Sequence, residues 1–247
     1  RVGLVGPDGS DMTPADVSGM EHGDDVLHLR DGRHQVVFSG LAEQPVPSLL
    51  RGFSAPVTLS SNLSDADYLF LAANDSDPFN RWDALQRVVM NTLIASSASV
   101  ARGQMPRLPN GLADALGASA SDASLEPAFR ALCLQLPGEA DIAREIGHDV
   151  DPDAIHAARA WLRRSLSDAL SPVLLGLYTD MAPAGPFSSQ ADAAGRRALR
   201  NVVLEYLGHG SVPEAGDLVT AQFQAADNMT DRLAALTGLV HAGLHGS

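Results

Sequence analysis

The hydrophobic period of the chain changes near residue 62, and this change constrains the fold more than any other feature. Before it, short β-prone runs alternate with turn residues. After it, apolar residues recur at steps of three and four. A period of two is typical of strands and a period of 3.6 is typical of helices. The sequence therefore predicts an α+β multidomain chain, with a partial antiparallel β-sandwich over 1–61 and an all-α, solenoid-like superhelix over 62–247.

The predicted strands lie between clusters of turn residues. Val2–Val5 precedes the turn cluster Pro7–Ser10, which predicts the entry to a hairpin. Two further runs, 25–29 and 34–38, flank an Asp-Gly dipeptide, the strongest short hairpin signal, so we expect them to pair. Val57–Leu59 supplies the last β-like run.

Capping residues mark the start of the helical part. Ser64 is placed as an N-cap with Asp67 three residues later, and Asp77 caps a helix with Pro78 at its first position. Pro172 is expected to kink or divide one long helix. Because no repeat of fixed length is recognisable, the solenoid prediction depends on the succession of helices with short links. The further predicted helices cover 109–117, 124–136, 138–146, 151–181, 188–208, 214–225 and 228–244.

Composition narrows the function classes. Hydrophobic residues make up 45% and charged residues 19%, as in globular domains. The formal net charge of -13 disfavours nucleic acid as a partner, because phosphate binding needs clustered Lys and Arg. No apolar run approaches the ~20 residues that cross a bilayer, so no membrane association is expected. The single Cys133 lies between leucines, which indicates a buried thiol in a reducing compartment, and we expect the cytoplasm.

Histidine spacing gives two weak metal-site candidates. Zinc hydrolases with a His-Glu-x-x-His helix need a Glu directly after the first His, and none of the eight histidines has one. In the segment 148–153, Asp153 could share a helical face with His156, but the Asp-Pro pair there is better explained as a helix cap. His241 and His245 are one turn apart without further ligands. We therefore expect no metal ligand in this chain.

Signatures of nucleophilic catalysis and phosphate binding are equally incomplete. Ser54 stands in the first half of a Gly-x-Ser-x-Gly elbow, but Pro56 replaces the last Gly. The segment Gly208-His209-Gly210 follows a helix and is interpreted as a C-cap turn rather than a phosphate loop. No pair of carboxylates can be nominated for acid–base catalysis from spacing alone, so no catalytic residue is predicted.

Several segments resemble proteobacterial aminopeptidase N, a family of zinc metallo-aminopeptidases. They are Pro45–Val57, Asn74-Asp75 leading into Phe79–Ala84, Arg197–Asn201, and Phe223–Asp231 with Leu233–Leu236. The resemblance covers nearly the whole chain and is weakest over 104–150.

The resemblance implies a location within a larger enzyme. Members of that family have an N-terminal β-domain, a thermolysin-like catalytic domain, a small β-sandwich and a C-terminal superhelix. This chain would correspond to most of the sandwich and the first part of the superhelix. The family removes N-terminal residues from peptides with zinc held by two His and a Glu, and it anchors the substrate amine with a Gly-Ala-Met-Glu-Asn loop. Neither motif occurs here, so no catalytic residue can be carried over and the chain alone is expected to be inactive.

In this interpretation the chain shapes the parent enzyme and supplies no reacting group. Its main partner is the catalytic domain of the parent polypeptide. The superhelix would cap the active-site cleft. Arg51 and Arg81 are expected to hold interdomain carboxylates or carbonyls, and Trp82 is expected to lie on the apolar face of its helix. Which residues line the substrate cavity is left open.

An alternative is a free-standing helical-repeat adaptor that binds protein partners through a concave surface. The chain starts within a strand-like run without Met and stops directly after a helical pattern, which favours an internal piece of a longer protein. A capping repeat with a polar outer face is absent from the sequence pattern. We therefore expect self-association through 228–244, where leucines and a valine exceed what one packing face needs.

Overall fold

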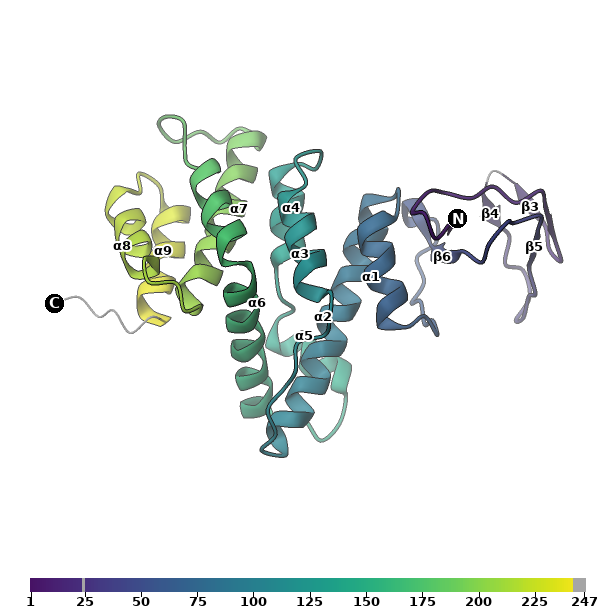
Figure 1. The fold of residues 1–247 in the computed structure, drawn as a ribbon, viewed down its shortest axis with the longest axis horizontal. Coiled ribbons are helices and arrows are strands. Elements are labelled where there is room, and N and C mark those ends of the chain that lie inside the picture. The colour runs from purple at the N-terminus through teal and green to yellow at the C-terminus, as the bar shows by residue number, and fades with distance from the viewer. Residues whose placement is uncertain (24, 242–247) are drawn as a thin grey trace. The chain divides into compact units, whose positions relative to one another are not determined.

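A computed structural model describes residues 1–23 and 25–241 of the chain (Figure 1). Its residues form two compact units, Arg1–Val88 and Val89–Ser247, which divide inside helix α2 (Pro78–Ala101). All strands of the described residues come before residue 50, and the α-helices begin at Asp65. The predicted order, antiparallel strands followed by helices, is confirmed. The domain boundary between residues 61 and 62 stays a prediction.

The strands of the first unit form three antiparallel pairs. β1 (Val2–Val5) pairs with β6 (Val46–Leu49), β2 (Asp16–Ser18) with β5 (Val37–Ser39), and β3 (His22–Gly23) with β4 (Val26–Leu27). The turn after β1 is confirmed, because Gly6 donates to the Ser10 carbonyl at 2.8 Å and a bridge joins Val5 to Asp11.

Two strand predictions are wrong. The runs 25–29 and 34–38 do not pair with each other, because β4 pairs with β3 and β5 pairs with β2. The Asp-Gly turn is held instead by His34, whose Nε2 accepts from the backbone of Arg30 at 3.1 Å and of Asp31 at 3.0 Å. Val57–Leu59 forms no described strand, and Val57 is 59% exposed. We did not predict the strand β6. It includes Pro47, and proline is tolerated in strands that lie at the edge of a sheet.

The helix caps follow the sequence closely. Ser64 caps α1 (Asp65–Asn74) in a reciprocal capping box with Asp67. Asp77 accepts from the Asn80 amide at 3.1 Å at the start of α2. Asp151 accepts from Ala154 at the start of α6 (Pro152–Asp180). Pro172 was expected either to kink or to divide a long helix. It lies within α6 and does not divide it, so the prediction of a division is wrong.

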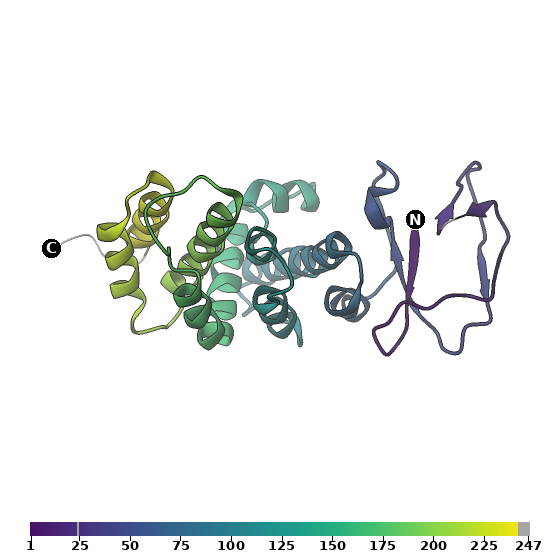
Figure 2. The same cartoon turned by 90° about the horizontal axis from the view of Figure 1, so that it is seen from above.

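The second unit is a succession of packed helices, which Figures 1 and 2 show one after another from α3 to α9. α7 (Ala191–His209) packs against α4, α6, α8 and α9, and its buried side chains surround most of its circumference, which is typical of a central helix. No described helix has the combination of length and apolar character that spanning a bilayer requires. The remaining helices are α3 (Leu112–Ser121), α4 (Pro127–Leu134), α5 (Glu139–Ile146), α8 (Ala215–Ala225) and α9 (Met229–His241).

Candidate functional site

The densest polar cluster of the first unit is centred on Arg51, directly after β6. Its Nη1 and Nη2 donate to the two carboxylate oxygens of Asp11 at 3.0 and 2.7 Å. Nη2 also lies 2.8 Å from Asp75 Oδ1, and Nε donates to Ser48 Oγ at 2.9 Å. Such bidentate guanidinium–carboxylate pairs fix both partners in orientation as well as in distance.

The same cluster reaches the junction between α1 and α2. Asn80 donates through Nδ2 to Ser48 Oγ and to the Leu49 carbonyl, both at 2.8 Å. Asp77 accepts from the Gly52 amide at 2.8 Å, and Ser76 donates to Asp11 at 2.6 Å. The cluster therefore joins the end of the strand segment to the first two helices.

The backbone around Arg51 is held in an uncommon conformation. Leu50 and Phe53, neither of them glycine, have φ angles of 63° and 53°, and Gly52 has 64°. Left-handed residues other than glycine carry strain that the surrounding contacts must outweigh. Gly3 on β1 is also required, because a Cβ there would overlap the Arg51 guanidinium. A glycine inside a strand indicates such a close approach, and this signal was overlooked.

The charges of the cluster stabilise one another. Burial alone would lower the pKa of Arg51, but Asp11, Asp75 and Asp77 together raise it. The hydrogen bond from Arg51 lowers the pKa of Asp11, and a hydrogen bond from Ser76 adds to the effect against the opposing influence of burial. Asp75 is 3% exposed, and its Oδ2 has no hydrogen-bond partner among the described residues. A buried carboxylate of this kind depends on its guanidinium partner.

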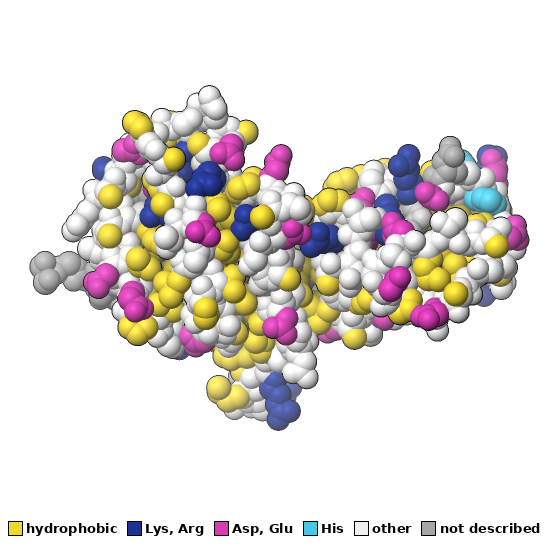
Figure 3. All heavy atoms as spheres, turned by 45° about the horizontal axis from the view of Figure 1, so that its top comes forward, with side chains coloured by type: hydrophobic (Ala, Val, Ile, Leu, Met, Phe, Trp, Pro, Cys, Tyr) yellow, Lys and Arg dark blue, Asp and Glu magenta, His cyan; other side chains and the backbone are white. Residues whose placement is uncertain are grey.

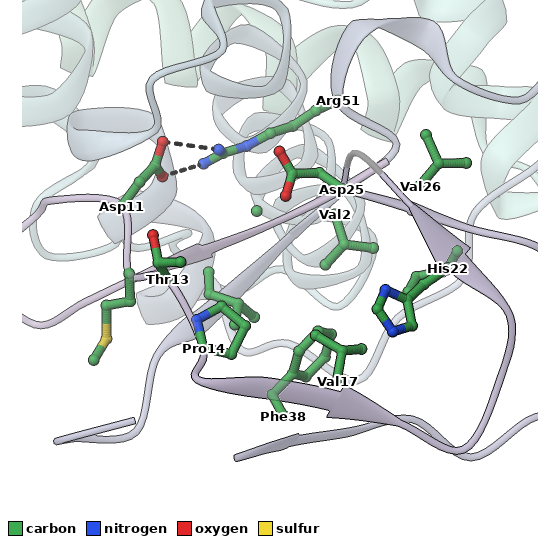
Figure 4. A pocket seen from close by; sticks show the side chains of 14 residues that line it. Val2, Asp11, Thr13, Pro14, Val17, His22, Asp25, Val26, Phe38 and Arg51 are labelled. Atoms are coloured by element: carbon green, nitrogen blue, oxygen red, sulfur yellow. Dashed lines mark hydrogen bonds and ion pairs between the residues drawn. The ribbon is translucent and has the colours of Figure 1, made fainter. Parts of the chain in front are cut away.

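A cavity of about 170 Å³ lies beside this cluster. Figure 4 shows Asp11 and Arg51 joined at one end of it and Val17 with Phe38 at the other. His22 and Asp25 also line the cavity. The guanidinium is already held by two carboxylates and a hydroxyl, so at this end of the cavity it fixes geometry.

Arg81 and Trp82, which the sequence analysis also considered for a functional role, make contacts within the fold of the first unit. Arg81 donates through Nε to the Ala72 carbonyl of α1 at 3.2 Å. Both residues follow the predicted domain boundary, so this contact is not the interdomain one that was expected. Trp82 is half-buried, and its ring lies 5.4 Å from that of Phe79, which in turn lies 3.8 Å from the ring of Phe53. Phe53 is 69% exposed.

A second polar network connects four helices of the second unit, α6 to α9. Asn201 on α7 donates to Asp231 Oδ1 at 2.8 Å and accepts from Gln222 Nε2 at 2.8 Å. Gln222 on α8 accepts from the Tyr178 hydroxyl at 3.1 Å. Asn228 donates to Asp231 Oδ2 at 2.8 Å and also caps α9 by accepting from the Asp231 amide. Gln222 and Asp231 are 4% and 6% exposed, so this network is part of the core.

This network joins two segments that stood out in the sequence only by their resemblance to a known family. Arg197–Asn201 and Phe223–Asp231 are separated along the chain, and the pair Asn201–Asp231 brings them together. Beside them lies a cavity of about 450 Å³, lined by the loop 183–188 and by Arg196, Arg197 and Asp227. The loop is anchored, because Phe187 donates its amide to Asp227 at 2.9 Å and packs under the Arg197 guanidinium.

The histidine candidates are not brought together. His156 Nδ1 lies 2.9 Å from Glu139 Oε1 rather than beside Asp153, and His148 contacts its neighbour Asp149 at 3.4 Å on the surface. The residues that the structure describes include no group of three His, Cys, Asp or Glu able to hold a metal ion. His245 and the His241 side chain lie outside the described part.

The remaining sequence candidates have structural roles. Gly210 is the C-cap of α7 and donates to the Tyr206 and Leu207 carbonyls, as the C-cap interpretation requires. Cys133 is buried with 2% exposure. Ser54 follows the 3-10 turn Arg51–Phe53, and the next α-helix begins only at Asp65, so Ser54 does not stand on the sharp strand-to-helix turn of a nucleophile elbow.

Family models match the chain in two parts. Residues 1–62 match a domain of unknown function, DUF3458, described as an Ig-like fold. Residues 65–247 match a second domain of unknown function, DUF3458_C, described as ARM repeats.

Curated relatives carry one name. The chain is 41% identical over 221 residues to an aminopeptidase N of Caulobacter vibrioides and 37% identical over 219 residues to an aminopeptidase N of Escherichia coli. Each alignment covers 89% of this chain and 25% of the relative. The chain therefore spans about a quarter of the length of these relatives, and the predicted resemblance to aminopeptidase N is confirmed.

A solved structure shares the fold. The crystal structure of Legionella pneumophila aminopeptidase A in complex with aspartic acid matches with a TM-score of 0.77 at 24% identity. The match covers 98% of this chain and 28% of that one. At this identity the likeness bears on the fold alone.

Proposed function

Because the chain belongs to the DUF3458_C family of ARM-repeat domains and carries the Ig-like DUF3458 domain before them, we propose that it is a non-catalytic part of a longer aminopeptidase. The longer enzyme removes N-terminal residues from peptides with a zinc ion, and this chain supplies an Ig-like domain and the first part of a helical superhelix. The observation that carries the proposal is the alignment with aminopeptidase N over 89% of this chain but only 25% of each relative.

The chain's own residues support a structural role. The histidines lack the His-Glu-x-x-His spacing of this class of zinc hydrolase. The described residues provide no three-ligand cluster, so they do not fit zinc. The two polar clusters consist mainly of hydrogen bonds and ion pairs between side chains of different elements, which they hold together. We therefore place zinc and the reacting groups in other parts of the longer protein, and derive no catalytic step from this chain.

In the proposed enzyme the packed helices cap the active-site cleft and limit access to peptides. Closing a cleft with a rigid wall keeps bulk water away from the reaction and restricts which substrates enter. The buried network around Asn201 and Asp231 supports this role, because it locks α7, α8 and α9 to one another. The single buried thiol, Cys133, favours a reducing compartment, and we propose the cytoplasm.

Reconstitution tests the proposal. The chain is purified alone, and separately co-expressed with the rest of the longer polypeptide as a second chain. Alone it should bind no stoichiometric zinc and release no amino acid from chromogenic amino-acid amides. Co-expressed, it should co-purify with the second chain and restore chelator-sensitive activity that the second chain lacks by itself. Zinc-dependent activity of this chain alone would overturn the proposal, as would full activity of the second chain without it.

A further inference from the structure

A polar cavity of about 240 Å³ lies inside the second unit, away from the clusters described above. It opens between α6 and α7 at the end of α4. Its polar lining comes from Arg159 and Arg163 on α6 and from Glu205 and Tyr206 on α7, and the segment Leu134–Leu136 completes the wall. Its position depends on α6 and α7 packing against each other, as do α4 and α7.

Arg163 is the most buried charge in this cavity, with 7% exposure. Its Nη2 lies 2.9 Å from Glu205 Oε1. Among the described residues, no acceptor is recorded for its Nε or Nη1. A guanidinium has five N–H donors, and a buried one is costly unless these donors find acceptors.

Arg159 lies one helical turn before Arg163, so both side chains leave the same face of α6. Its Nε donates to the Pro137 carbonyl at 2.9 Å, and no acceptor for its terminal nitrogens is recorded among the described residues. Burial lowers the pKa of Arg159, and the charge of Arg163 lowers it further. The carboxylates of Glu205 and, outside the cavity lining, Glu139 act in the opposite direction and favour the charged form of Arg159. The lining itself thus holds two guanidiniums and one carboxylate.

The other walls do not supply the missing acceptor. The Tyr206 hydroxyl is committed, because it donates to the Leu134 carbonyl at 2.7 Å. Burial raises the pKa of Tyr206, so the hydroxyl stays protonated. Glu205 contacts Arg163 through one oxygen, and its side chain is 43% exposed. The cavity thus combines surplus N–H donors, two guanidiniums against one lining carboxylate, and room for a group larger than one water, which takes roughly 30 Å³ of liquid.

We propose that this cavity binds a small oxyanion, a carboxylate or phosphate group, between Arg159 and Arg163. Planar guanidinium groups match the oxygens of both anions. The chain as a whole has a net charge of -13, so anions are not drawn to it in general and binding must come from this pocket. The inference does not depend on the proposed function.

Isothermal titration of the whole chain tests the site, with inorganic phosphate and succinate as the two probes at constant ionic strength. Saturable one-to-one binding of either probe is expected, and the probe that binds tells whether the natural ligand carries phosphate or carboxylate. Arg159→Gln should weaken binding about tenfold or more, as expected for lost hydrogen bonds to a charged group. Glu205→Gln should tighten it several-fold, because the competing carboxylate is removed.

Arg164→Gln is the matched control, because Arg164 is the next residue on α6 but is exposed, and it contacts the His209 carbonyl at 3.4 Å. It should leave the affinity unchanged. Circular dichroism of each variant checks that the fold is kept. The proposal is overturned if neither probe binds at about 10 mM, where even millimolar sites fill. It is also overturned if Arg164→Gln weakens binding as much as Arg159→Gln, or if Glu205→Gln weakens it.

Discussion

Arg51 and Asp11 are joined by a bidentate ion pair, with Nη1–Oδ2 at 3.0 Å and Nη2–Oδ1 at 2.7 Å. The two residues are 40 positions apart. The same guanidinium contacts the fully buried side chain of Asp75 at the end of α1. One side chain thus ties Asp11, Ser48 of β6 and the C-terminal end of α1 together.

Arg51→Ala should destabilise the first unit by about 3–5 kcal/mol, because it leaves the buried carboxylate of Asp75 without a counter-charge. Urea denaturation followed by tryptophan fluorescence measures the free energy of unfolding, in a Trp161→Phe background so that Trp82 of the first unit is the one reporter. Arg30→Ala is the control, since Arg30 and Glu21 form an exposed pair at 2.8 Å whose loss should cost less than about 1 kcal/mol. Equal losses in the two variants would contradict the assigned role of Arg51.

Asp11 should make the stability of the first unit depend on acid pH. Arg51 lowers the pKa of Asp11 in the folded state, so between the folded value and the unfolded value near 3.9 the unfolded state binds more protons. The contribution is complete above the unfolded pKa and is lost as the pH falls through the folded pKa. Urea midpoints measured between pH 6 and pH 2.5 should fall less steeply in Asp11→Asn than in the parent chain. Parallel curves would refute the linkage.

Asp231→Ala should destabilise the second unit by about 1–3 kcal/mol, because the amides of Asn201 and Asn228 lose their acceptor in a buried network. Asp217→Ala serves for comparison. Asp217 is an exposed acid in the first turn of α8, so its removal should change stability by only a few tenths of a kcal/mol. Hydrogen exchange at the ends of α7 and α9 should rise in Asp231→Ala alone. Unchanged exchange there would show that the network does not lock these helices.

Gly210→Ala should cost about 1–3 kcal/mol, because the added methyl group would overlap the Ser167 hydroxyl on α6. The same change at Gly176, where a Cβ meets no atom within 4 Å, should stabilise the helix by up to about 1 kcal/mol. Thermal denaturation of both variants should show a lower melting temperature for Gly210→Ala and a higher one for Gly176→Ala than for the parent chain. If Ser167→Gly fails to relieve part of the Gly210→Ala loss, the overlap is not its cause.

The chain should self-associate through α9. Met229, Leu233, Leu236 and Val240 are 77%, 56%, 43% and 55% exposed and recur at helical spacing. On the face drawn in Figure 3, charged side chains of both signs are interspersed and hydrophobic side chains show between them over the helical unit. We expect a concentration-dependent sedimentation coefficient that the double substitution Leu233→Gln, Leu236→Gln abolishes. A strictly monomeric parent chain would refute this expectation. Leu244, the last leucine of the predicted segment 228–244, lies outside the described residues.

The amino-acid sequence by itself determined the class of the fold and the starts of several helices. Periodicity and capping are local: Ser64, Asp77 and Asp151 each accept from an amide three residues away, so their roles can be predicted without a three-dimensional structure. The absence of a complete catalytic motif is visible in the same way, because such motifs combine fixed residue types at fixed spacing.

Strand pairing and the buried polar clusters were decided only by the tertiary structure. The Asp-Gly signal near residue 31 predicted the wrong partners, because pairing depends on which strands meet across a core and not on the turn alone. Arg51 reaches Asp11 across 40 residues, and Asn201 reaches Asp231 across 30. Arg159 and Arg163 could be placed on one helical face from their spacing, but the cavity they line exists only because α7 packs against α6 and α4 packs against α7. These contacts depend on distances in space. Side-chain packing sets those distances, and the spacing of residues along the chain does not encode them.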